Sequence, residues 1–104
     1  MDKRSFKRIS VGYKTEIVYG ENRYSGTIEN LSASGVNVLT EPLDPHIDFL
    51  PDDAIDLTFE TPTGEPVTLH CTIMWSSKIP PGNVRHRIGM EIAELPWDKV
   101  GAFI

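Results

Sequence analysis

The chain has 104 residues and a mass of 11.6 kDa, with 39% hydrophobic and 24% charged residues, as expected for one globular domain. Its formal net charge of −5 argues against binding to duplex nucleic acid or to an anionic membrane surface. Its apolar runs are too short to span a bilayer, and its charged beginning lacks the apolar stretch of a signal peptide. We therefore expect a cytoplasmic protein.

Alternating apolar and polar residues, separated by glycine- and proline-rich turns, predict β-structure along most of the chain. The strands are expected at residues 14–19, 23–29, 35–40, 55–59, 67–75 and 85–92. Residues 41–53 hold three prolines and several acidic side chains, which predicts a loop, with one helical turn after Pro45.

Six strands without a long helix predict an all-β fold, in which an antiparallel sheet closes into a small barrel and leaves no exposed edge. We expect the barrel to span residues 13–95. Residues 1–12 are rich in lysine and arginine and are predicted to form a flexible basic arm. Residues 96–104 place apolar side chains at helical spacing and predict a short C-terminal helix.

The arm carries Arg4 and Arg8 at a spacing of four residues. A guanidinium group can pair with two phosphate oxygens, or with the O6 and N7 acceptors of guanine. In an acidic chain, this local concentration of positive charge is a candidate anion-binding site. The alternative is that the arm is a solvated tail without a ligand.

A second motif, Asn30-Leu31-Ser32-Ala33-Ser34-Gly35, follows the second predicted strand. Asn and Ser side chains close local turns, and glycine permits a close approach of the backbone. Rigidly held amide and hydroxyl groups also suit the edge of a purine. A plain turn between two strands is the alternative interpretation.

Three further features have two interpretations each. Trp75 either stacks on a ligand base or packs in the barrel core. Arg85 and Arg87 either add positive potential at the barrel mouth or lie on a solvated strand face. The single cysteine, Cys71, lies in an apolar run, which favours a buried and unreactive thiol.

No catalytic or metal-binding pattern is present in the sequence. The three histidines are scattered, and the aspartates of residues 44–56 lack the glycine and terminal glutamate of a calcium loop. Ser32 and Ser34 have no histidine near them in the sequence and no nucleophile elbow. We therefore expect a binding protein without enzymatic activity, without a cofactor and without a metal.

The two motifs, in this order and with β-structure between them, resemble the Arg-x-x-x-Arg and Asp/Asn-x-Ser-x-x-Gly signature of the PilZ domain. The resemblance covers essentially the whole chain, including Trp75 and the Gly89-Met90-Glu91 segment. It implies a six-stranded PilZ-like barrel of the split-barrel type. It also implies that the protein is bacterial and binds the second messenger cyclic di-GMP.

The resemblance assigns the arm to the ligand. Arg4 and Arg8 would grip a phosphate and the Hoogsteen edge of guanine, so that the arm folds over the ligand. Lys3 precedes the first arginine, and a basic residue there accompanies an intercalated pair of ligand molecules in the family. We therefore expect two molecules of cyclic di-GMP per site.

The resemblance assigns the turn to the same ligand. Asn30 and Ser32 would donate or accept hydrogen bonds at guanine, and Gly35 would keep the turn open. Asn30 stands where many family members have aspartate. Because an amide lacks the charge of a carboxylate, we expect somewhat weaker binding.

Two functions remain at this point. The first is a cyclic di-GMP receptor whose arm becomes ordered on binding and whose altered surface is read by an unidentified downstream protein. The second is a PilZ-like adaptor that binds proteins with weak or no nucleotide affinity. Binding of single-stranded nucleic acid is disfavoured by the net charge and by the lack of strands that interleave aromatic and basic residues.

Overall fold

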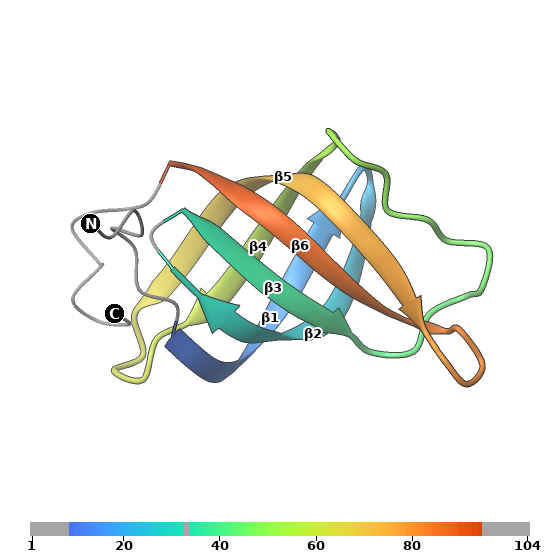
Figure 1. The fold of residues 1–104 in the computed structure, drawn as a ribbon. Coiled ribbons are helices and arrows are strands. Elements are labelled where there is room, and N and C mark those ends of the chain that lie inside the picture. The colour runs from blue at the N-terminus through green and yellow to red at the C-terminus, as the bar shows by residue number, and fades with distance from the viewer. Residues whose placement is uncertain (1–8, 33, 95–104) are drawn as a thin grey trace, which may run out of the picture.

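The structure, a computed structural model, describes residues 9–32 and 34–94. Figure 1 shows that six strands form a closed barrel. The strands are β1 (Ile9–Tyr19), β2 (Asn22–Leu31), β3 (Gly35–Thr40), β4 (Ala54–Glu60), β5 (Pro66–Ile79) and β6 (Arg85–Glu94). Neighbouring strands are antiparallel in the order β1-β2-β3-β6-β5-β4, and β1 closes the barrel against β4. The predicted all-β, six-stranded antiparallel barrel is confirmed.

The strands are longer than the sequence pattern predicts. β1 begins at Ile9 and not at Lys14, so residues 9–12, which we placed in the arm, belong to the barrel wall. β5 continues to Ile79, and Trp75 therefore lies inside this strand and not at its end. Pairing with a neighbouring strand extends both elements beyond the alternating segments. The predicted C-terminal helix lies outside the described residues, and no helix occurs within them that could cross a membrane.

The loop between β3 and β4 crosses one end of the barrel. We call residues 43–53 the strap. The predicted helical turn after Pro45 is absent. A tight turn replaces it, in which Asp44 accepts the N–H of His46 at its side chain (2.8 Å) and the N–H of Ile47 at its carbonyl (3.1 Å). Aspartate side chains favour such turns over helix because they capture a nearby backbone donor.

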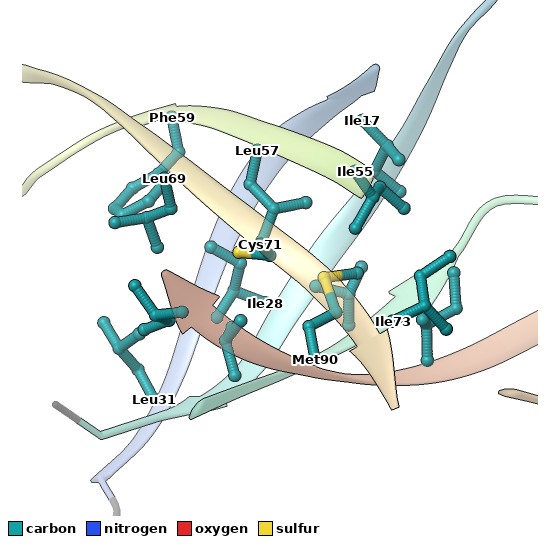
Figure 2. Close-up of a cluster of buried hydrophobic side chains, with 14 of the residues drawn as sticks. Ile17, Ile28, Leu31, Ile55, Leu57, Phe59, Leu69, Cys71, Ile73 and Met90 are labelled. Atoms are coloured by element: carbon teal, nitrogen blue, oxygen red, sulfur yellow. The ribbon is translucent and has the colours of Figure 1, made fainter. Parts of the chain in front are cut away.

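The interior of the barrel is filled by alternate residues of each strand. Figure 2 shows aliphatic side chains from several strands meeting there, including Ile17, Ile28, Leu57 and Ile73, each fully buried. Cys71 is part of this core, as predicted. Burial raises the pKa of its thiol to about 12, which removes the thiolate that redox or nucleophilic chemistry requires.

The strand pairing shifts at four places, and two of these β-bulges determine the outer face beside the β2–β3 turn. One lies in β2 between Ile28 and Asn30, and the other lies in β5 between Ile73 and Trp75. At a bulge two residues of one strand oppose a single residue of its neighbour. Glu29 and Asn30 consequently both escape the core, as do Met74 and Trp75, although strict alternation would bury one residue of each pair.

The connectivity sorts the loops to the two ends of the barrel. The β2–β3 turn lies at the end where β1 begins, and the strap lies at the opposite end (Figure 1). The two ends of the barrel are therefore built differently.

Candidate ligand-binding site

The β2–β3 turn is closed by Ser32. Its hydroxyl accepts the N–H of Gly35 (3.1 Å) and that of Ser34 (3.4 Å), and it lies 3.3 Å from the Gly35 carbonyl oxygen. The backbone N–H of Ser32 donates to the same carbonyl (2.9 Å). Ser32 is 2% exposed. Its hydroxyl thus fixes the turn, which is the structural role that the sequence left open.

The strand register brings the start of β1 to this turn. Ile9 lies opposite Leu31, and Ser10 lies opposite Asn30. Arg8 is the residue directly before Ile9 in the sequence. The chain that carries Lys3, Arg4 and Arg8 therefore joins the barrel next to the Ser32 turn. These three side chains lie outside the described residues.

A row of outward-facing residues crosses the wall from this point. Asn30 in β2 lies opposite Asn37 in β3, Asn37 lies opposite Gly89 in β6, and Gly89 lies opposite Trp75 in β5. Because directly opposed residues on neighbouring strands share a face of the sheet, these four positions form one lateral row. The two bulges provide its ends, since they turn Asn30 and Trp75 outward.

Trp75 lies on the outside of the barrel, with 43% of its surface exposed. The packing of Trp75 in the core is therefore ruled out. Its indole covers Gly89: a Cβ added at Gly89 would fall closer than 3.0 Å to three atoms of the ring. Glycine is the residue that lets the aromatic ring lie across β6.

A shallow hollow of about 270 Å³ lies beside the indole. It is lined by Ser34, Gly35, Asn37, Met74, Trp75, Gly89, Met90 and Glu91. One wall is thus the motif turn and the other is the aromatic ring. The hollow combines an apolar ring face with amide and hydroxyl groups, which suits a planar ligand that carries hydrogen-bonding edges.

The two arginines of β6 already have partners in the barrel. Arg87 makes a two-point ion pair with Glu29, at 2.8 and 3.1 Å, and its hydrogen bonds keep the pKa of Glu29 below its usual value. Arg85 donates to the carbonyl of Thr40 (3.0 Å). These contacts favour the interpretation that Arg85 and Arg87 are structural over the one that they hold an anion.

The structure brings together part of the predicted site. Gly35 and Trp75 line one hollow, although they come from different strands. Ser32 and Asn30 do not line it: Ser32 closes the adjoining turn, and Asn30 lies opposite Asn37, which does line it. Asn37 and Met74 were not predicted as site residues, and Gly89 was named only as part of the family resemblance. Asn37 had a visible signal, because it is polar between Val36 and Val38. The alignment of Gly89 with Trp75 depends on the β5 bulge and has no such signal.

Among residues 9–32 and 34–94, no three histidine, cysteine, aspartate or glutamate side chains gather as ligands for a metal ion. The described surface has several hollows, and the hollow beside Trp75 is the one that borders the β2–β3 turn, with aromatic, amide and hydroxyl groups.

The structure is thus a small closed β-barrel domain with a shallow hollow on its outer wall. The sequence profile of the PilZ domain matches residues 2–100. The chain belongs to the PilZ family. None of the curated proteins compared with it matches.

Two solved structures share the fold. The Bacillus subtilis inhibitor of motility MotI/DgrA superposes with a TM-score of 0.76 at 16% identity, over 99% of this chain. This chain spans 49% of that protein's length. The PilZ domain of YcgR from Escherichia coli, solved with c-di-GMP, superposes with a TM-score of 0.70 at 15% identity, over 97% of this chain and 86% of that one.

Proposed function

We propose that the protein is a receptor for cyclic di-GMP that signals to a downstream protein. The observation that carries this proposal is the register of β1 against β2, which attaches the Arg4–Arg8 arm beside the Ser32 turn. The described chain begins at Ile9, opposite Leu31, which directly precedes Ser32 in the sequence. The YcgR PilZ domain, which shares the fold, was solved with this ligand.

The proposed division of labour follows from the charges. In β6, Arg87 is held by Glu29 and Arg85 by a carbonyl oxygen, so we assign the positive charge for the phosphates to the arm. Guanidinium groups suit this role because each can bind two oxygens of one phosphate. A second ligand molecule, as expected from Lys3, would stack on the first.

The barrel supplies the fixed half of the site. Ser32 positions the turn, Asn30 and Asn37 offer amide groups to a guanine edge, and Trp75 offers a ring face for stacking. Such stacking contributes about 1–3 kcal/mol per base. Binding then orders the arm against the barrel, and the new surface is what a partner recognises.

Isothermal titration of the full chain with cyclic di-GMP tests the proposal. We expect saturable heat with a dissociation constant at or below the micromolar range and two ligands per chain. Arg8→Ala should weaken binding at least about tenfold, or ~1.4 kcal/mol. Arg23→Ala is the matched control, because Arg23 is exposed at the far end of β2 and pairs weakly with Glu16 (3.4 Å).

The outcomes separate the two functions. Absence of heat at millimolar nucleotide would contradict the receptor and favour the adaptor. If Arg8→Ala and Arg23→Ala lose the same amount of affinity for cyclic di-GMP, the specific role proposed for the arm is contradicted. A stoichiometry of one would retain the receptor and reject the stacked pair of ligands.

A further inference from the structure

Three large apolar side chains of the described residues are strongly exposed: Leu50 (55%), Met74 (54%) and Trp75 (43%). Scattered apolar residues are normal on a protein surface, but a group of them marks an interaction site. Leu50 belongs to the strap, whereas Met74 and Trp75 belong to β5.

Hydrogen bonds hold the strap alongside β5. The N–H of Asp52 donates to the carbonyl of Ile73 (2.7 Å), and the N–H of Ile73 donates to the carbonyl of Asp53 (2.9 Å). Further along, the hydroxyl of Ser76 donates to the carbonyl of Phe49 (2.7 Å). Leu50 lies between these anchor points and therefore runs beside the part of β5 that carries Met74 and Trp75. We call Leu50, Met74 and Trp75 the β5 patch.

The backbone keeps the β5 patch exposed. The bulge after Ile73 turns both Met74 and Trp75 outward, so the apolar surface is a product of the strand geometry and not of a loose loop. On the strap, Phe49 fills the barrel end and leaves its neighbour Leu50 at the surface. Methionine and tryptophan are well suited to binding partners, since the first adapts its shape and the second buries a large area.

Acidic groups border the β5 patch. Asp52 follows Leu50 on the strap, and Glu91 lines the hollow beside Met74. The nearest lysine, Lys78, is engaged by Asp48 (3.3 Å) and by the carbonyl of Pro45 (3.1 Å). The border of the patch therefore carries negative charge without a free described cation beside it.

We propose that the β5 patch is the docking surface for a partner protein that presents an apolar side chain flanked by lysine or arginine. Charge complementarity selects this partner. A second copy of the chain would bring the same acidic border and the same net charge of −5, which disfavours self-association through this face. The signalling role of the surface rests on the proposed receptor function, whereas docking itself does not need the nucleotide.

The location connects docking to the ligand. Met74 and Trp75 line the hollow and also belong to the β5 patch, so an occupant of the hollow contacts two of the three residues of the docking surface. By thermodynamic linkage, a ligand that changes the affinity for the partner by some factor has its own affinity changed by the same factor when the partner is bound.

Two synthetic peptides provide the test on the full chain, without nucleotide. Both contain the same leucine and tryptophan residues, but one is flanked by lysines and arginines and the other by glutamates. We expect the basic peptide to shift the backbone amide resonances of the strap and β5, and the acidic peptide to leave them unchanged. The double variant Leu50→Ser, Met74→Ser should weaken binding about tenfold.

Matched controls separate the patch from general effects. Thr68→Ser alters another exposed position of β5 and should retain binding. Asp52→Asn should weaken binding of the basic peptide. Asparagine is chosen because it tolerates the positive φ of 74° at this position. Glu60→Gln removes a charge at the other end of β4 and should have little effect.

Equal binding of both peptides, no binding of either, or full binding by the double variant would overturn the docking surface. A separate titration of cyclic di-GMP reports on the receptor function. Peptide binding without nucleotide binding would retain the docking surface and reject the receptor, and the reverse result would do the opposite.

Discussion

At the scale of single residues, Gly89 determines where Trp75 can lie. The indole covers the glycine so closely that a methyl group in its place would overlap the ring. Because Gly89 has no side chain, the indole of Trp75 can lie against the backbone of β6, where it forms the aromatic wall of the hollow. This is a positioning role, since Gly89 has no side chain to contact a ligand.

Gly89→Ala should displace the indole of Trp75 and change its fluorescence. The chain has two tryptophans, so the measurement uses a Trp97→Phe background in which Trp75 is the single indole. We expect a shifted emission maximum and weaker binding of cyclic di-GMP. Gly12→Ala is the control, because a Cβ at Gly12 meets no atom within 4 Å; identical spectra for both variants would contradict the role of Gly89.

A second residue, His86, is buried at the strap end of the barrel. It is 1% exposed, and its Nε2 atom has no hydrogen-bond partner among the described residues. Phe49 approaches the imidazole edge-on, with ring centroids 5.0 Å apart. Burial lowers the pKa of His86, Lys78 lowers it further, and Asp48 acts in the opposite direction.

This environment predicts a loss of stability in mild acid. Because the pKa is lower in the folded state than the unfolded value of about 6.5, the unfolded chain binds more protons as the pH falls. The contribution of neutral His86 is therefore present above pH ~6.5 and is lost as the pH falls from there toward the lowered folded pKa. Urea unfolding between pH 8 and pH 5 should show this decline.

His86→Leu should flatten the decline, since leucine cannot bind a proton. His46→Gln changes an exposed histidine of the strap and is the control for the loss of a histidine at another position. If His86→Leu retains the full decline, other groups are responsible for it.

At the scale of elements, the strap owes its position to Phe49. This side chain is 2% exposed and contacts the rings of Tyr19 and Tyr24, with centroids 5.1 and 5.8 Å away. The hydroxyl of Tyr19 adds polar anchors, because it donates to Asp53 and accepts the N–H of Leu50 (3.2 Å). The strap is thus a structural part of the barrel end, despite its loop-like sequence.

Phe49→Ala should cost about 3–5 kcal/mol of unfolding free energy, the usual range for a buried phenylalanine. Its neighbour provides the control. Leu50→Ala truncates an exposed side chain and should change stability by less than about 0.5 kcal/mol. Chemical denaturation of both variants decides the matter, and similar losses would mean that the strap does not plug the barrel through Phe49.

At the bulges, the sequence pattern no longer predicts which face of the strand a side chain lies on. The strands themselves were predictable, because Ile55, Leu57 and Phe59 alternate clearly with polar residues. The pairs Glu29–Asn30 and Met74–Trp75 interrupt that alternation. A shift of one residue reverses the face of every side chain that follows, so neither the outward position of Trp75 nor its alignment with Gly89 could be read from the pattern.

At the scale of the whole molecule, closure of the barrel produces two different ends and a continuous outer wall. The end that carries the Ser32 turn also receives the arm, and the opposite end is closed by the strap. The row from Asn30 to Trp75 runs along the wall between them. A ligand on this wall and a partner on the β5 patch would therefore both contact Met74 and Trp75, which line the hollow and belong to the patch.

The sequence by itself determined the class of fold, the buried and unreactive Cys71, and the motifs that identify the family. These properties depend on local composition and on the period-two alternation of side chains, which a linear chain displays directly. The tertiary structure decided which residues share a site. Strand register and two bulges aligned Asn30, Asn37, Gly89 and Trp75, because pairing between strands that are distant in sequence is fixed by the packing of the closed barrel and not by any local signal.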